Sequence, residues 1–242
     1  MTGNPFDFGG KVVLVTGVAR PGQIGHGVAR AFGAAGARLV LADVNAVAVA
    51  ERAREFAGLG YEAEPTAGDL TDPDVAAHAI EAAVKRFGRL DALVNVAGGL
   101  TTFGPADGLE LRGFDREVNI NLKTAFLMSR AARPELAKAG GAVVNFSSLA
   151  YYRPMAPMAV YAAAKAGVAA LTQSLAKEWV GQVRVNAVAP SMVRTPENVA
   201  AVSDPDARYI ELDQLTAAVM FLASPASGAI TGHVLPLVGT EI

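Results

Sequence analysis

Short apolar runs and longer helical stretches alternate along almost the whole chain. The runs are rich in valine and leucine and stop at Gly, Asp, Ser or Pro, as β-strands do; they span 11–17, 37–44, 90–99, 141–148, 183–191 and 233–239. Because they are mostly unbroken, we expect parallel strands that are buried on both faces. Helical stretches lie between them, at 25–36, 46–60, 72–88, 122–140, 160–179 and 212–225. The alternation predicts an α/β fold, with a doubly wound, mostly or wholly parallel sheet of about seven strands and helices on both faces.

Composition and charge disfavour several classes of protein. The net charge is −2, from 21 basic and 23 acidic residues that are scattered along the 242 residues, so we expect no nucleic-acid or membrane partner. There is no cysteine, which rules out a disulfide framework and a thiolate metal site. The first residues do not resemble a secretory signal, and no apolar run reaches the roughly 18 residues that span a bilayer. We therefore expect one domain over 1–242, located in the cytoplasm.

The ends of the first two runs suggest a dinucleotide site, because open α/β sheets bind ligands at the carboxyl ends of their strands. A turn with glycines at 17, 22, 25 and 27 leads from the first run into a helix, where backbone amides can bind a phosphate. A tight turn alone would also need glycine. Asp43 ends the second run, 18 residues after Gly25, where a carboxylate can bind an adenosine ribose and repel a 2′-phosphate. This favours NAD over NADP, although Arg20 would partly offset the repulsion; alternatively, Asp43 caps the next helix.

Further motifs follow the later runs and complete a family pattern. They are Asp69 with Leu70, Asn95 to Gly98, and Tyr161-x-x-x-Lys165, with Ser148 thirteen residues before the tyrosine and Asn121 on the preceding helix. Together with the glycine turn and Asp43, these motifs resemble a classical short-chain dehydrogenase/reductase over nearly the whole chain, with 3-oxoacyl-acyl-carrier-protein reductase as the nearest named activity. The resemblance implies a single Rossmann-type domain and an NAD(P)-dependent oxidoreductase.

The resemblance also assigns roles to individual residues. It implies a catalytic set of Asn121, Ser148, Tyr161 and Lys165. It implies cofactor contacts from Gly17, Arg20, Ile24, Gly25, Asp43, Asp69, Leu70, Asn95, Ala97, Gly98, Tyr161, Lys165, Pro190, Val193 and Thr195. No metal is expected: the aspartates at 69, 72 and 74 lack the glycine and the closing glutamate of a calcium loop.

The four-residue spacing of Tyr161 and Lys165 places a phenol and an ammonium on one face of a helix. A cation about 5 Å away, at an effective dielectric near 20, stabilises phenolate by about 3 kcal/mol, so we expect a lowered pKa for Tyr161. The tyrosine would then act as general base on an alcohol and as general acid on a ketone. The resemblance implies that Ser148 binds the reacting oxygen, that Lys165 holds the nicotinamide ribose and that Asn121 anchors a water.

Several positions depart from the family pattern. The glycine turn is two residues longer than usual, and Gln23 stands in place of its middle glycine. The longer turn resembles that of enoyl reductases, which use Tyr-x9-Tyr-x6-Lys. Tyr151 and Tyr161 satisfy the first interval, but residue 168 is valine, so carbonyl or alcohol chemistry is preferred. Ser191 replaces the usual glycine after Pro190, and a substrate flap over 196–210 is shorter than usual.

We therefore expect an oxidoreductase that transfers hydride between NAD(H) and a secondary alcohol or ketone. A 3-oxoacyl-acyl-carrier-protein reductase using NADPH is one alternative, and a non-catalytic dinucleotide sensor or scaffold is another. The resemblance also implies a homotetramer, formed partly through the helices that carry Asn121 and Tyr161. A moderately apolar substrate is expected from the residues near the site, which are Leu100, Leu149, Tyr151, Met192 and Tyr209.

Overall fold

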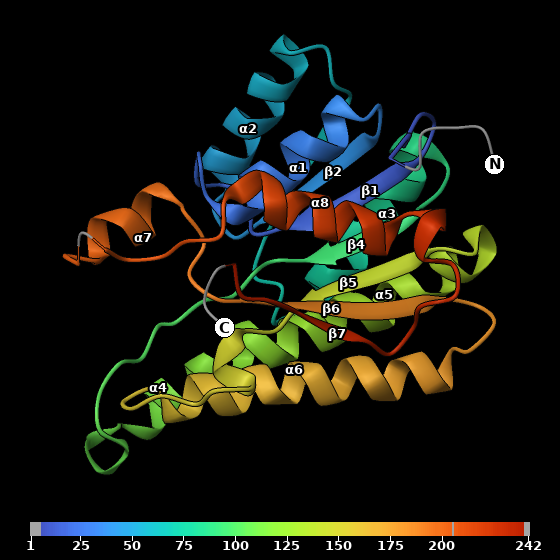
Figure 1. The fold of residues 1–242 in the computed structure, drawn as a ribbon. Coiled ribbons are helices and arrows are strands. Elements are labelled where there is room, and N and C mark those ends of the chain that lie inside the picture. The colour runs from blue at the N-terminus through green and yellow to red at the C-terminus, as the bar shows by residue number, and fades with distance from the viewer. Residues whose placement is uncertain (1–5, 205, 240–242) are drawn as a thin grey trace.

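The computed structural model describes residues 6–204 and 206–239, and one parallel sheet runs through them (Figure 1). The strands lie in the order β3-β2-β1-β4-β5-β6-β7, and every neighbouring pair is parallel. They are β1 (Val12–Thr16), β2 (Arg38–Asp43), β3 (Ala63–Ala67), β4 (Ala92–Asn95), β5 (Ala142–Phe146), β6 (Arg184–Pro190) and β7 (Val234–Leu237). The expected doubly wound parallel sheet is confirmed.

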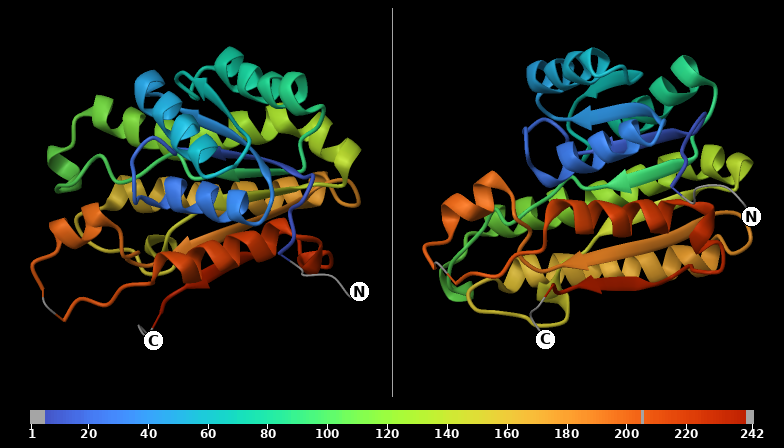
Figure 2. Two further views of the ribbon diagram at one scale, coloured as in Figure 1. Left: turned by 90° about the horizontal axis from the view of Figure 1, so that it is seen from above. Right: turned by 45° about the horizontal axis from the view of Figure 1, so that its top comes forward.

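Helices cover both faces of the sheet (Figures 1 and 2). The first face carries α1 (Ile24–Ala34), α2 (Ala46–Gly58) and α8 (Leu212–Ala223), and its core includes Phe32 and Phe56. The second carries α3 (Pro73–Phe87), α5 (Thr124–Ala139) and α6 (Ala159–Glu178), with a core that includes Trp179. The central strands are buried on both sides, which explains their mostly apolar sequences. No helix in the described ranges is long and apolar enough to cross a membrane.

Some elements were not among the strands and helices that the sequence predicted by range. β3 has the sequence AEPTA and lies at the edge of the sheet, where mostly half-buried residues suffice and a proline is tolerated. The helix predicted from residue 122 begins earlier, as α4 (Leu111–Val118), and continues through a π-helical turn, η2 (Asn119–Lys123), into α5. α4 has only eight residues, most of them exposed, so its apolar residues Leu111, Phe114 and Val118 form too short a pattern to mark a helix as clearly as in the longer ones. The expected flap contains a short helix, α7 (Pro196–Ala201), and residue 205 of that flap lies outside the described residues.

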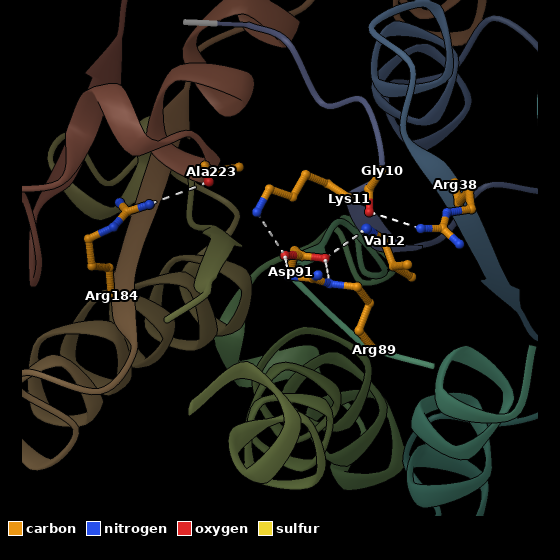
Figure 3. Close-up of polar contacts among 8 residues, drawn as sticks. All are labelled: Gly10, Lys11, Val12, Arg38, Arg89, Asp91, Arg184 and Ala223. Atoms are coloured by element: carbon orange, nitrogen blue, oxygen red, sulfur yellow. Dashed lines mark hydrogen bonds and ion pairs between the residues drawn. The ribbon is translucent and has the colours of Figure 1, made fainter. Parts of the chain in front are cut away.

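Ionic contacts hold the amino-terminal edge of the sheet together (Figure 3). Asp91, only 8% exposed, accepts hydrogen bonds from Lys11 Nζ at 3.2 Å and from the Val12 amide at 2.9 Å. Arg89 donates to both of its carboxylate oxygens, at 2.8 and 2.6 Å. The carboxylate thus ties the start of β1 to the start of β4, at the edge opposite to the carboxyl ends of the strands.

Arg184 closes the end of α8 at the same edge of the sheet (Figure 3). Its guanidinium donates to the main-chain carbonyls of Leu222 at 2.8 Å and Ser224 at 3.0 Å, and to Ser227 Oγ at 2.7 Å. These carbonyls lie in the last turn of the helix and just beyond it, where intrahelical donors are lacking. Arg184 therefore anchors α8 to β6.

We predict that Asp91→Ala lowers the free energy of unfolding by about 1–3 kcal/mol, because it leaves the buried Val12 amide without its acceptor. Urea unfolding would measure the change. Glu81→Gln, at an exposed position of α3, is the control and should leave the stability unchanged. Equal stability of wild type and Asp91→Ala would contradict the role given to this carboxylate.

Candidate active site

The carboxyl ends of the parallel strands meet at one edge of the sheet, and α4 and α7 project beyond this edge (Figure 1). β1, β4, β5 and β6 are consecutive neighbours in the sheet, so the segments that follow them lie side by side. Most of the site residues predicted from the sequence lie on these segments or on the helices that they enter. The topology thus explains how residues from 17 to 195 come together.

Reciprocal hydrogen bonds lock α6 to the end of β5. Lys165 Nζ donates to the Phe146 carbonyl at 2.9 Å, and the Ser147 hydroxyl donates to the Lys165 carbonyl at 2.8 Å. Lys165 is only 4% exposed, so its ammonium group is held within the protein. The Ser147 hydroxyl is engaged in this structural contact. The next residue, Ser148, is the serine that lies thirteen residues before Tyr161.

Tyr161 and Lys165 lie close together, as their spacing predicts. Lys165 Nζ is 5.8 Å from the centre of the Tyr161 ring, and the Ser148 side chain is near enough to the phenol to lower its pKa. Ser148 Oγ also accepts from the Ala150 amide at 3.2 Å, at the start of the 3₁₀ turn η3 (Leu149–Tyr151). Serine, phenol and ammonium therefore form one cluster at the end of β5.

The expected lowering of the Tyr161 pKa is wrong for the protein without ligand. Burial raises the pKa above its ordinary value of 10.0; the Ser148 side chain lowers it, and the charge of Glu117 raises it further. Burial also lowers the pKa of Lys165 to about 8, against a smaller opposing effect of Glu117. The simple charge-pair estimate fails because it omits the desolvation of both groups and the negative charge of Glu117.

Asn121 lies in the π-helical turn and clamps the segment after β4. Its Oδ1 accepts from the Gly99 amide at 2.9 Å, and its Nδ2 donates to the Gly99 carbonyl at 2.9 Å. Gly98 lies directly against this amide, because a Cβ there would come within 2.6 Å of Asn121 Oδ1. A glycine is therefore required at 98, in the strand-end segment that the sequence assigns to the cofactor.

Sequence reasoning missed Glu117, the last but one residue of α4. Its side chain is fully buried, and Asn121 Nδ2 donates to its Oε1 at 3.0 Å. A signal was available: residue 117 precedes residue 121 by four positions, so a helix that extended back to residue 117 would place both on one face.

The long glycine turn uses two of its glycines for backbone shape and one for close packing. Gly17 and Gly22 have φ angles of +74° and +72°, in the left-handed region. A Cβ on Gly25 would lie 2.1 Å from the Gly17 carbonyl oxygen, so no side chain fits there. Gln23 precedes α1 in extended backbone with φ −83°, which explains why it can replace the usual glycine.

The amino-terminal end of α1 fits a phosphate. α1 begins at Ile24, and no side chain caps its first turn. Helix amino termini carry unpaired amide groups and a partial positive charge, which attract anions. The bare helix end and the close approach of Gly25 to Gly17 suit the pyrophosphate of a dinucleotide.

Asp43 and Arg20 both have protein partners in this structure. Asp43 Oδ2 accepts from the Ala19 amide of the glycine turn at 2.9 Å, and its Oδ1 accepts from the Asn45 amide at 3.1 Å. Asn45, not Asp43, caps α2. Arg20 Nη1 lies 2.6 Å from both carboxylate oxygens of Glu197, in the first turn of α7. The turn is thus tied to β2 and to the flap.

The residues after β3 and β4 divide between surface and interior. Asp69 is exposed and accepts from the Thr71 amide at 2.9 Å, whereas Leu70 is buried in the core.

Asn95 is buried, and its Nδ2 donates to Asn145 Oδ1 of β5 at 2.8 Å. Ala97 follows at the strand end and donates its amide to Thr16 Oγ1 at 2.9 Å. Asn95 thus cross-links the two central strands, beneath the segment that carries Ala97.

Three further predicted residues follow β6 or end it. Pro190 is the last residue of β6, and Val193 pairs with Ile210 in an isolated bridge. Thr195 is 2% exposed, and its Oγ1 accepts from the Asn198 amide at 3.3 Å as the cap of α7. Its hydroxyl therefore has a structural partner in addition to the expected phosphate contact.

Within the described residues, no group of His, Asp or Glu is arranged to hold a metal ion.

A doubly wound sheet with a glycine turn against an uncapped helix end is the architecture of a dinucleotide-binding protein. Comparisons with known proteins agree. A family model described as enoyl-(acyl carrier protein) reductase matches residues 17–239. D-threitol dehydrogenase of Mycolicibacterium smegmatis is 37% identical over 248 residues, which cover 97% of this chain and 94% of that protein.

Two other proteins extend the comparison. The 3-oxoacyl-(acyl-carrier-protein) reductase of Thermotoga maritima is 32% identical over 95% of this chain and 97% of that protein. The crystal structure of a short-chain type dehydrogenase/reductase from Mycobacterium marinum matches with a TM-score of 0.89 and 30% identity, over 98% of this chain and 97% of that one. The chain belongs to the short-chain dehydrogenase/reductase family. It is an oxidoreductase acting on CH–OH groups, with a nicotinamide dinucleotide as its class of cofactor.

Proposed function

We propose that the protein interconverts a secondary alcohol and its ketone with NAD(H), and that Tyr161 carries the proton. The cluster of Ser148, Tyr161 and Lys165 at the end of β5 is the observation that supports this proposal. A bound nicotinamide supplies the hydride acceptor in oxidation and the hydride donor in reduction. In oxidation the hydroxyl proton of the alcohol goes to Tyr161 Oη, and in reduction Tyr161 returns a proton to the carbonyl oxygen.

The other residues of the proposed catalytic set hold this proton transfer in place. Ser148 binds the reacting oxygen together with Tyr161, which orients the carbinol carbon. Lys165 contributes a positive charge that favours phenolate and binds the ribose next to the nicotinamide. Asn121 holds the segment after β4, through its paired bonds with Gly99. Val168 stands where enoyl reductases carry lysine, which supports alcohol chemistry over reduction of a C=C bond.

We predict that Tyr161→Phe lowers kcat for alcohol oxidation by about 10²–10⁴-fold, because the general base is lost. NADH formation from a panel of secondary alcohols, and its consumption with ketones, would measure the change. Tyr61→Phe is the matched control, since it removes a phenol that packs beside α2, away from the cluster. Retention of wild-type turnover by Tyr161→Phe would exclude the proposed proton carrier.

The same assay distinguishes the rival functions. A non-catalytic sensor would bind NADH but show no turnover in wild type or in Tyr161→Phe. A 3-oxoacyl-(acyl-carrier-protein) reductase, the activity named for the Thermotoga maritima relative, would reduce 3-oxoacyl thioesters with NADPH. We favour NAD because Asp43 is a carboxylate at the end of β2 and because Arg20, the nearby cation of the turn, is paired with Glu197.

We predict that Asp43→Ser raises the ratio of kcat/KM with NADP⁺ to that with NAD⁺ by about tenfold or more, because the charge that repels a 2′-phosphate is removed. Initial rates with each coenzyme would measure the ratio. Asp74→Asn, which removes an equal charge from the exposed start of α3, should leave it unchanged. An unaltered ratio in Asp43→Ser would refute this account of coenzyme choice.

We also infer a homotetramer and a substrate flap over 196–210, while a cytoplasmic location and a single domain stay predictions. Large apolar side chains on α4 and α5 support the assembly: Leu111, Phe114 and Phe126 are 81%, 45% and 40% exposed. Contact of α7 with the glycine turn supports the flap, since Pro196 touches Gly22 and Glu197 pairs with Arg20.

We predict that Phe126→Asp reduces the molar mass in solution from that of four chains to that of two or one, because a charge is placed on the apolar face. Light scattering after size-exclusion chromatography would measure the mass. Val47→Asp, at an exposed position of α2, is the control and should leave the assembly intact. A wild-type protein that is already monomeric would refute the inferred assembly.

A further inference from the structure

Glu117 is a buried carboxylate that the proposed reaction does not use. It is 0% exposed, although neighbouring residues of α4 are mostly exposed. A buried charge is tolerated only when hydrogen bonds replace its hydration. Glu117 Oε1 accepts from Asn121 Nδ2 at 3.0 Å, and Oε2 accepts from the Thr101 amide at 2.9 Å and the Thr101 hydroxyl at 2.6 Å. All three partners are donors, an arrangement that satisfies an ionised carboxylate.

These bonds make Glu117 part of a brace around the segment after β4. Asn121 bonds both the amide and the carbonyl of Gly99, and Glu117 bonds Asn121 and Thr101 at the same time. Residues 99–101 are therefore fixed against the π-helical turn at two points. Loss of the carboxylate would free the Thr101 end and remove one of the acceptors of the Asn121 amide.

Glu117 also acts electrostatically on the cluster on α6, which packs against α4. Its negative charge raises the pKa of Tyr161 and that of Lys165. These are the two groups on α6 whose pKa the charge of Glu117 affects, and residue 101 contributes only its amide and hydroxyl as donors. Asp115 and Arg116, its neighbours on α4, are exposed to solvent. The brace therefore carries a negative charge that acts on the proposed proton carrier.

We propose that Glu117 is a positioning residue of this active site: its carboxylate fixes the Asn121 amide and residues 99–101, and supplies the negative charge that faces the Tyr161–Lys165 pair. The consequence for the reaction rests on the oxidoreductase function proposed above. The charge opposes phenolate formation and favours the ammonium form of Lys165, so it holds the pair in its fully protonated state up to a higher pH.

The direct test is a titration of Lys165 in the cofactor-free protein. Lysine labelled with ¹³C at Cε would be followed by NMR, and the resonance missing from Lys165→Met identifies Lys165. Its midpoint is expected at about 8 in wild type. In Glu117→Gln the midpoint moves to lower pH by about half a pH unit or more, because the opposing charge is lost. Asp115→Asn, which removes an equal charge from the exposed face of α4, keeps the wild-type midpoint.

Glu117→Gln is expected to fold. The glutamine amide oxygen can accept both bonds from Thr101. Asn121 Nδ2 keeps its hydrogen bonds to the main-chain carbonyls of Gly99 and residue 117, each at 2.9 Å. A folded Glu117→Gln with the wild-type Lys165 midpoint would overturn the proposal. Should this variant not fold, Glu117→Asp decides the question. It retains the charge, so the Lys165 midpoint stays in place while kcat falls. A Lys165 midpoint lowered by half a pH unit or more would equally overturn the proposal.

Activity provides a second readout. In Glu117→Gln both limbs of the pH profile of alcohol oxidation move to lower pH, because Tyr161 and Lys165 each lose a proton more readily. A purely structural role would lower kcat and leave the profile in place. Absence of turnover in wild type would refute the proposed function alone, since the NMR titration requires neither substrate nor coenzyme.

Discussion

The site depends on the crossed hydrogen bonds between Lys165 and the end of β5. The ammonium binds the Phe146 carbonyl while the lysine carbonyl receives the Ser147 hydroxyl, so α6 can neither slide along nor turn away from the strand. Tyr161, one helical turn earlier, is thereby set beside Ser148. Below these bonds, Asn145 Nδ2 donates to Thr172 Oγ1 of α6 at 3.0 Å, which adds a second buried link between helix and strand. The same few contacts thus pack α6 against β5 and position the residues of the candidate site.

Most of the fold was predictable because both faces of its central strands are covered. Burial on two sides favours mostly apolar sequences, as in β1 and β5, and such runs are easily recognised. β3 escaped recognition because an edge strand is under weaker demand and here contains Pro65. α4 escaped because it has only eight residues and most of them are exposed, so its few apolar positions do not form a long pattern. The prediction therefore fails where few side chains are buried.

The proximity of the site residues was predictable, but their electrostatics were not. Spacing alone placed Tyr161 and Lys165 on one face of a helix, and the structure brings them together. The direction of the Tyr161 pKa depends on burial and on Glu117, neither of which the motif contains. In the same way, the sequence showed Gln23 as a departure from the glycine pattern, whereas only the backbone shows that Gly22 has taken the left-handed conformation instead.

Asp43 has a structural role in the glycine turn and a proposed role in coenzyme choice, so a substitution there affects both. One carboxylate oxygen accepts from the Ala19 amide of the glycine turn, and in the proposed function the charge of the same group disfavours a coenzyme with an extra phosphate. Replacement by a neutral or basic residue alters both properties at once. If the proposed preference for NAD holds, a change to the phosphorylated coenzyme that keeps the shape of the turn needs a second substitution to restore an acceptor for the Ala19 amide.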